Sequence, residues 1–262
     1  MMYFVIFFAA FGTSCLTLYS GFGLGTVLMP VFALFFPIQT AVVATALVHG
    51  ASNILKVAIL GKKADWGIVL RFGVPAVIAA FAGAACLRYT VEFEPIASYV
   101  IGSLQASITP LKIIMACMMA FFALFELIPS LNSLHFDRKY LALGGILSGF
   151  FGGFSGHQGA LRSTFLTKMD LTTESFVGSN TVIGFMVDLV RIFVYGMFFL
   201  TVPSTSGIMV EYWPLVITGT FAAFIGTLVG KRFLKKVTMK TVKYITGSFL
   251  LLIAVLLGSG VL

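Results

Sequence analysis

The sequence predicts an all-α polytopic membrane protein made of two inverted repeats, each a re-entrant broken-helix hairpin followed by three transmembrane helices. First, 59% of the 262 residues are hydrophobic and only 10% are charged, against about 25% charged residues in a typical soluble domain. Second, two apolar segments are interrupted by glycine-rich breaks. Third, several long segments contain no Asp, Glu, Lys or Arg at all, namely 1–55, 141–161, 192–210, 212–230 and 244–262.

This composition excludes a soluble globular protein and a primary role in nucleic-acid binding. It predicts an integral membrane protein that is surrounded by the lipid bilayer. The N-terminus lacks a basic region and a small-residue cleavage site, so we expect the first segment to remain in the membrane rather than act as a signal peptide. Cys15, Cys86 and Cys117 lie in apolar stretches and are odd in number, which predicts neither a disulfide framework nor a redox motif. No pattern calls for a metal ion or a cofactor, and the sequence alone leaves the oligomeric state open.

The membrane segments are expected to be helices, because only helices satisfy their own backbone hydrogen bonds in lipid. In chain order they cover 2–20, 26–36, 39–60, 67–88, 108–129, 141–152, 158–168, 173–201, 212–230 and 243–262.

The two breaks have the sequences SGFGLG (20–25) and GGFSGHQG (152–159). Each is followed by a helix of about ten residues, which is too short to cross a hydrocarbon core of about 30 Å. Lysine and arginine gather in 61–66, 130–140 and 231–242, so the positive-inside rule makes these loops cytoplasmic.

The opposite loops, 89–107 and 202–211, are nearly free of basic residues and are expected to be external. These assignments are consistent only if each broken segment dips into the membrane and returns to its own side. Both termini are then external, and six full spans remain.

The resulting order, a hairpin and three spans, occurs twice, in 1–130 and in 138–262. Because three spans is an odd number, the second copy is predicted to be upside down. Inverted repeats with paired broken helices are typical of secondary transporters, whose site lies between the repeats at the membrane midplane.

Five segments resemble the TauE/SafE sulfite-exporter family of permeases. They are GFGLGTVLMP (21–30), AVVATALVHGASN (41–53), Asp65-Trp66, GGFSGHQGALRSTFL (152–166) and VGSNTVIGFMVDLVR (177–191). The resemblance covers nearly the whole chain. It implies a transporter, expected in the bacterial inner membrane, that moves small sulfur-containing anions such as sulfite, thiosulfate or organosulfonates, generally outward.

Two other classes of function are weighed against a transporter. A passive anion channel could use the same hairpins without alternating access. A membrane enzyme is disfavoured, since the chain has no HExxH, GxSxG or Walker motif and therefore no predicted catalytic residue. Ser155 in Gly-Phe-Ser-Gly (153–156) would need a base, and we expect His157 not to point at it.

The anion is expected to bind at the two breaks, where helix N-termini present free N–H groups. Gly25 and Thr26 would contribute from the first break. The second would contribute Ser155, Gly156, His157 and Gln158, together with Arg162 one turn further on. Small residues in membrane helices also serve close packing, and Arg162 could instead neutralise Asp188. Ser20 is a further candidate hydrogen-bond donor.

Two spans supply the remaining candidates. On 39–60, Thr45, His49 and Asn53 share one face and are predicted to line the cavity, while Lys56 is expected to reach the cytoplasmic surface. Ser179 and Asn180 lie in the equivalent segment of the second repeat. His157, His49 and Asp188 are the candidates for carrying a proton, and Asp188 could pair with Arg191 or Arg162.

Overall fold

A computed structural model of the chain describes the backbone of residues 1–20, 24–90, 93–102, 104–132, 136–167, 169–201, 203–233 and 239–262. Within these ranges, side chains are described except for those of 18–20, 101, 104, 132, 198–201, 203–211, 231–233 and 239–242. Ser20, whose hydroxyl was a candidate donor, and the glycines at 21 and 23 therefore lie outside the described side chains.

Helices make up most of the chain, as the sequence predicts. The α-helices are α1 (Met2–Ser20), α2 (Leu24–Ala33), α3 (Ile38–Leu60), α4 (Trp66–Thr90), α5 (Pro110–Leu127), α6 (Pro129–Asn132), α7 (Leu141–Ser155), α8 (Gly159–Leu166), α9 (Thr173–Thr201), α10 (Pro203–Phe233) and α11 (Met239–Gly258). Two short 3₁₀ helices, η1 (Gly61–Lys63) and η2 (Arg138–Tyr140), lie in connections.

Among the described residues, five helices are long and apolar enough to cross a membrane, namely α3, α4, α5, α9 and α10. The sixth predicted span, α11, counts among the shorter apolar helices over its described part, Lys243–Gly258. The prediction that 202–211 is a loop is wrong, because α10 already begins at Pro203.

The other predicted external loop, 89–107, contains an antiparallel β-hairpin that the sequence analysis missed. Strands β1 (Ala97–Ile101) and β2 (Leu104–Ile108) pair in register, and Gly102 supplies the positive φ of +62° that the tight turn needs. The hairpin caps the end of α11, since Ser107 N donates to Gly260 O at 3.0 Å.

The helices pair in a pattern that repeats between the two halves. The first helix of each hairpin packs on the second span of the other half, so that α1 contacts α10 and α7 contacts α4. The first spans, α3 and α9, contact each other, as do the last spans, α5 and α11. Such an exchange is what two related repeats would produce, and the inverted orientation of the second repeat stays a prediction.

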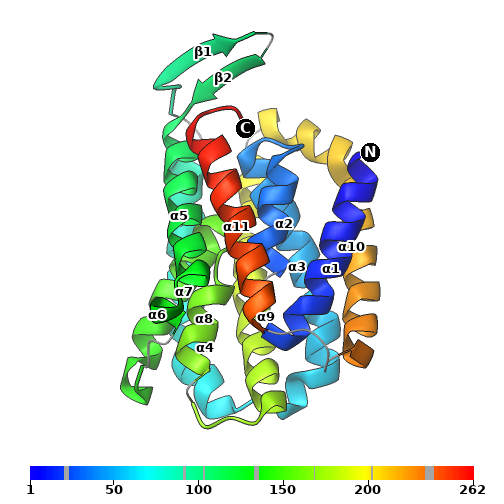
Figure 1. Cartoon of the computed structure of the whole chain (residues 1–262), viewed down its shortest axis with the longest axis vertical. Helices are drawn as coiled ribbons and strands as arrows, with labels where there is room; N and C mark the ends of the chain where they lie inside the picture. Colours follow the sequence, from blue (N-terminus) through cyan, green and yellow to red (C-terminus); the bar gives the residue numbers. More distant parts are fainter. Residues whose placement is uncertain are drawn as a thin grey trace.

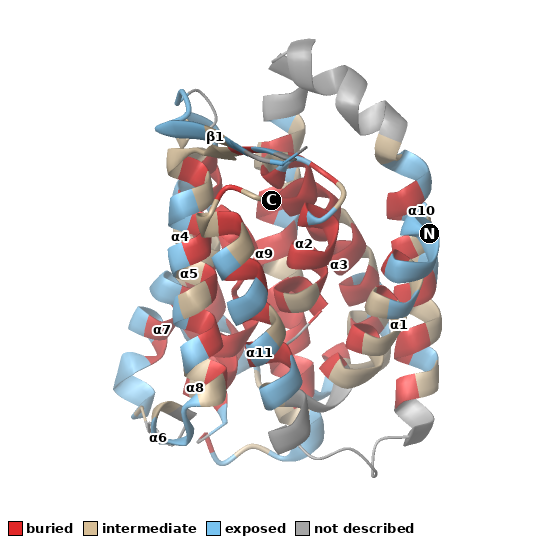
Figure 2. Ribbon diagram, turned by 45° about the horizontal axis from the view of Figure 1, so that its top comes forward, coloured by how far each residue is buried: buried red, intermediate tan, exposed pale blue. Residues whose placement is uncertain are grey.

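The two first spans form the centre of the bundle. In the apolar windows of α3 and α9, 61% and 67% of residues are buried, compared with 39% in α5 and 44% in α10. Figure 2 shows the same distribution, with buried residues concentrated on the inner helices and exposed ones on the periphery.

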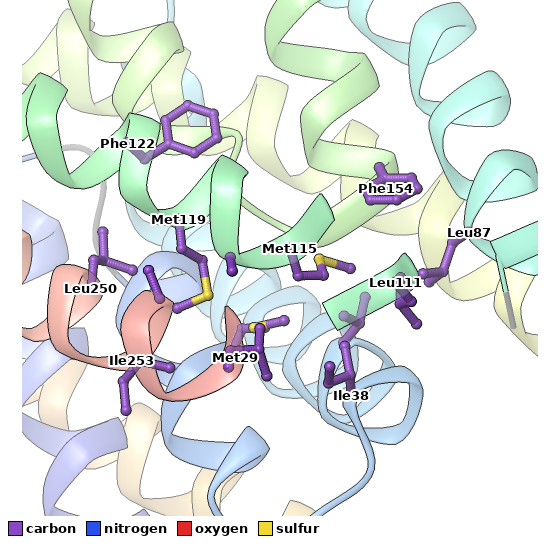
Figure 3. Packing of buried hydrophobic residues seen from close by; sticks show 14 of the residues in the cluster. Met29, Ile38, Leu87, Leu111, Met115, Met119, Phe122, Phe154, Leu250 and Ile253 are labelled. Atoms are coloured by element: carbon purple, nitrogen blue, oxygen red, sulfur yellow. The ribbon is translucent and has the colours of Figure 1, made fainter. Parts of the chain in front are cut away.

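A large apolar core joins α5 and α11 to both halves (Figure 3). Met115, Met119 and Phe122 of α5 belong to this buried cluster together with Leu250 and Ile253 of α11. Residues from the short helix α2 and from α7 complete it, so the hairpins are held from one side by packed side chains rather than by lipid.

The chain ends and the β-hairpin lie at one end of the bundle, and η1 and α6 lie at the other (Figure 1). This placement puts the predicted external elements together and two of the predicted cytoplasmic connections together.

The sidedness itself can be measured by cysteine labelling. In a variant whose three native cysteines are replaced by alanine, we expect Ser98→Cys in β1 to react with an impermeant thiol reagent added outside intact cells. Lys62→Cys in η1 should react only after the membrane is permeabilised, because the basic loops face the cytoplasm. The reverse pattern, or labelling of both positions from one side, would contradict the predicted topology.

Candidate functional site

The start of α2 and the break between α7 and α8 contact each other, although they come from different halves of the chain. Helix α7 ends at Ser155, and Gly156 follows in the left-handed conformation with φ of +86°. A Cβ atom built on Gly25 would lie only 3.1 Å from the carbonyl oxygen of Gly156. The two hairpins therefore meet through glycine, and a side chain at position 25 would press against the backbone of the second break, whereas one at position 156 would press against the Arg191 guanidinium.

Asp188 of α9 is the centre of a buried polar cluster beside this contact. One carboxylate oxygen, Oδ2, lies 2.5 Å from His49 Nδ1 and accepts a hydrogen bond from Asn53 Nδ2 at 2.8 Å. The other, Oδ1, accepts from Gln158 Nε2 and from Arg191 Nη1, both at 3.1 Å. The carboxylate thus joins α3, the second break and α9, and its four contacts fill its acceptor capacity.

Arg162 of α8 binds next to this carboxylate without touching it. Its Nε donates to Asn180 Oδ1 at 2.7 Å and its Nη1 donates to Gln158 Oε1 at 2.9 Å. The amide of Gln158 therefore bridges Arg162 to Asp188. The question left open by the sequence is answered, since the ion pair of Asp188 is with Arg191.

The buried charges around these residues do not balance. Lys56, Arg162 and Arg191 are each at most 3% exposed, whereas among the described side chains Asp188 is the one buried carboxylate that shares this region with them. Counted at formal charges, with Lys56 protonated and both histidines neutral, three cations and one anion give a net charge of +2. Buried charge without compensation is costly, so this imbalance favours a site for an anion.

Several buried polar atoms near the cluster also have no hydrogen-bond partner among the described residues. They are Lys56 Nζ, Asn180 Nδ2, Arg191 Nε and His157 Nε2. The first three can only donate, and an unsatisfied buried donor costs about 1–3 kcal/mol. A ligand rich in acceptor oxygens would satisfy them, whereas a cation would not.

Two predicted site residues have other partners. Thr45 Oγ1 donates to Ala41 O of its own helix at 2.7 Å, and Ser179 Oγ accepts from Asp65 N at 2.9 Å, where it anchors the turn into α4. Thr26 is buried in the first turn of α2, 2% exposed.

His157 turns its ring toward α5 and away from the carboxylate. The ring stacks on Phe122 with centroids 5.5 Å apart. Its Nδ1 lies 3.0 Å from Ser155 Oγ, so the expectation that His157 does not point at Ser155 is wrong. The Ser155 hydroxyl donates to Phe151 O at 3.0 Å, which leaves Nδ1 as the donor of the pair and unable to accept the serine proton. The pair is therefore not arranged as a nucleophile and its base.

Two residues of this region, Gly184 and Tyr195, were not predicted from the sequence, and the predicted position of a third, Lys56, is wrong. Lys56 does not reach the cytoplasmic surface, because it is 1% exposed and lies among the helices. Gly184 gives the polar groups room, since a Cβ there would lie 3.2 Å from both Arg162 Nη1 and Asn53 Nδ2. Tyr195 donates its hydroxyl to Gly153 O and places its ring 5.8 Å from the Arg191 guanidinium.

The spacing of Gly184 could have been noticed. Asn180, Gly184 and Asp188 follow one another at four-residue intervals and so lie on one face of α9. Among the described residues, no group of three His, Cys, Asp or Glu side chains is placed to hold a metal ion.

The comparison with protein families gives one match. A family model described as "Sulfite exporter TauE/SafE" matches residues 6–257, a range that includes both glycine-rich breaks and every residue of the polar cluster. Comparisons with curated proteins and with solved structures give no match.

Proposed function

The chain belongs to the TauE/SafE sulfite exporter family, and on this premise we propose that it is a secondary transporter that exports small sulfur-containing anions such as sulfite, thiosulfate or organosulfonates. The observation that supports an anionic substrate most strongly is the net charge of +2 among Lys56, Arg162, Arg191 and Asp188. Oxyanions are small, carry several acceptor oxygens and match the unsatisfied donors of the same region.

The proposed binding place is the contact between the start of α2 and the second break. Glycine at positions 25 and 156 lets the backbone come close to a ligand, and the N-terminus of α8 presents N–H groups that no side chain caps. Arg162 lies on α8, one turn beyond Gln158, and Asn180 lies on α9. The two side chains are already hydrogen-bonded to each other. A planar guanidinium in this position can bind two oxygens of one anion at once.

His49 and Asp188 are the proposed proton-carrying pair. They are in direct contact at 2.5 Å, whereas the third candidate, His157, uses its Nδ1 on Ser155. The charged groups that face the pair are Arg191, which bonds the carboxylate, and Lys56 and Arg162, which interact with it electrostatically. A proton added to the pair raises the positive charge around the site, so it strengthens anion binding.

Coupling to a proton affects the direction in which the anion is transported. When a dianion moves with one proton, the complex is still negative, and a membrane potential acts on each elementary charge with about 2.3 kcal/mol per 100 mV. A potential that is negative inside therefore drives the complex outward. A pH gradient that is acid outside opposes this outward movement of a proton, so the membrane potential and the anion gradient supply the driving force for export.

Transport by purified protein in proteoliposomes tests the proposal. Sulfite, thiosulfate, sulfoacetate and taurine are offered one at a time at fixed membrane potential, with and without a pH gradient. We expect saturable transport of at least one of these compounds and faster transport when the side containing the anion is acidified. Flux that never saturates would indicate a channel, and absence of flux for all four would contradict the proposed substrate class.

The role of His49 gives a separate prediction. We expect His49→Gln to abolish the response of transport to the pH gradient, since glutamine keeps a polar contact with Asp188 but cannot take up a proton. Exchange between equal pools of anion should continue. The matched variant His157→Gln should keep the response, because its ring lies against Phe122.

The pH response of these two variants decides between the histidines. Loss of the response in His157→Gln but not in His49→Gln would move the proton-carrying role to the second break. Wild-type transport that ignores an imposed pH gradient would remove the coupling proposal altogether.

A further inference from the structure

Lys56 is a buried cation for which the described residues provide no partner. Its side chain is 1% exposed, and its Nζ makes no hydrogen bond. It lies on α3, one turn beyond Ser52 and less than one turn beyond Asn53. Helices α3 and α9 form the centre of the bundle. An ammonium group at this depth is expensive unless a partner or an aqueous cavity compensates its charge.

The carboxylate of Asp188 does not provide that partner. It interacts with Lys56 electrostatically, but its two oxygens already have contacts with His49, Asn53, Gln158 and Arg191. Arg162 adds repulsion at the same time. Lys56 therefore needs negative charge from something other than the side chains described around it.

Three hydroxyl groups gather on the same side of α3, each from a different helix. Ser14 Oγ of α1 lies 2.8 Å from Thr227 Oγ1 of α10, and both hydroxyls are within bonding distance of Ala223 O. Ser52 of α3 approaches the two others only at 3.5 Å, the limit of a hydrogen bond. All three are fully buried, and among the described residues the Ser52 hydroxyl finds no acceptor nearer than these 3.5 Å contacts.

The ammonium group and the hydroxyls belong to one region. Ser52 and Lys56 are spaced i, i+4 and share a face of α3. Lys56 also interacts electrostatically with Cys15, the neighbour of Ser14 on α1. A buried cation and a hydroxyl without a good acceptor, placed together between α1, α3 and α10, can both be satisfied by the oxygens of a small anion.

We propose that Lys56, with Ser52, Ser14 and Thr227, forms a second anion site, distinct from the one at the glycine contact. Lys56 is followed on α3 by one further turn and then by η1 (Gly61–Lys63), so the site lies between the glycine contact and the end of the bundle that is predicted to be cytoplasmic. It holds the same small oxyanion on its way to the central site. The identity of this ligand rests on the proposed function, while the existence of the site rests on Lys56 and the hydroxyls.

Equilibrium binding of radiolabelled sulfite to the purified full-length protein tests the inference. We expect wild-type binding to resolve into two components. Lys56→Met, which keeps the length of the side chain but removes the charge, should abolish one of them, and Lys56→Arg should restore it. Lys62→Met removes an exposed positive charge a few residues away and should leave both components unchanged.

The two proposals fail in different ways in this experiment. If Lys56→Met keeps both components, the second site is overturned. If Arg162→Gln keeps both binding components, the proposed site at the glycine contact is overturned, whatever the result for Lys56. Should Lys56→Met not fold, Ser52→Ala serves instead, and we expect it to weaken only the component assigned to Lys56, by about fivefold or more for one lost hydrogen bond. Unchanged binding in Ser52→Ala would equally overturn the inference.

Discussion

Gly156→Val is expected to abolish anion transport while the protein still inserts in the membrane. The residue has φ of +86°, which a β-branched side chain rarely adopts, and its Cβ would lie 2.9 Å from Arg191 Nη2. Arg191 bonds Asp188, so displacing it disturbs the whole polar cluster. Valine would also cover the backbone N–H groups of the break. Transport in proteoliposomes, normalised to the amount of inserted protein, measures the effect.

A glycine without close neighbours controls for the effect of valine itself. Gly196 of α9 has open space around its Cβ position, so Gly196→Val should transport nearly as well as wild type. Gly25→Ala is a milder probe of the same contact, because its Cβ would meet Gly156 O at 3.1 Å in an allowed backbone conformation. We expect it to reduce transport partly. Wild-type rates in both Gly156→Val and Gly25→Ala would show that the glycine contact is only packing.

Arg162→Lys is expected to weaken sulfite binding by roughly ten- to a hundredfold, which corresponds to about 1.5–3 kcal/mol for one charge-assisted contact. Lysine keeps the charge but lacks the planar fork that holds Asn180 and Gln158 in place and that would bind two anion oxygens. The apparent affinity should therefore fall much more than the thermal stability. Binding of labelled sulfite and the unfolding temperature are measured on the same preparations.

The alternative is that Arg162 only connects Gln158 and Asn180. In that case Asn180→Asp, which supplies a carboxylate to the arginine, would stabilise the protein and leave anion affinity unchanged. Under the present account the added negative charge lowers the net charge of the region and weakens anion binding. A stabilised variant with wild-type affinity would therefore assign Arg162 a structural role.

The sequence was sufficient to predict the helices, because runs of about 20 apolar residues leave the backbone no other choice in lipid. The breaks were equally visible, since Gly156 and its neighbours interrupt an otherwise continuous run. The β-hairpin at 97–108 was missed because its alternating residues are few and lie between charged and apolar segments. Its stability comes from contacts such as Ser107 with Gly260, which are distant in sequence.

The site was predicted as a set of residues but not as an arrangement. Local spacing places His49 and Asn53 on one face of α3, yet their contact with Asp188 depends on how α3 packs against α9. The same packing buries Lys56, which the sequence alone places near a helix end where a lysine would ordinarily reach water. Distances between helices decided each of these cases, and periodicity contains no information about them.

The central claim, that an oxyanion binds where the two hairpins meet, is tested most directly by sulfite counterflow. Proteoliposomes loaded with unlabelled sulfite are diluted into labelled sulfite, and the label inside is followed over time. The account predicts transient accumulation above equilibrium with wild-type protein and with Gly196→Val, and none with Gly156→Val inserted at equal density. Equal accumulation with Gly156→Val would contradict the claim. So would sulfite flux without transient accumulation of label in any of the preparations.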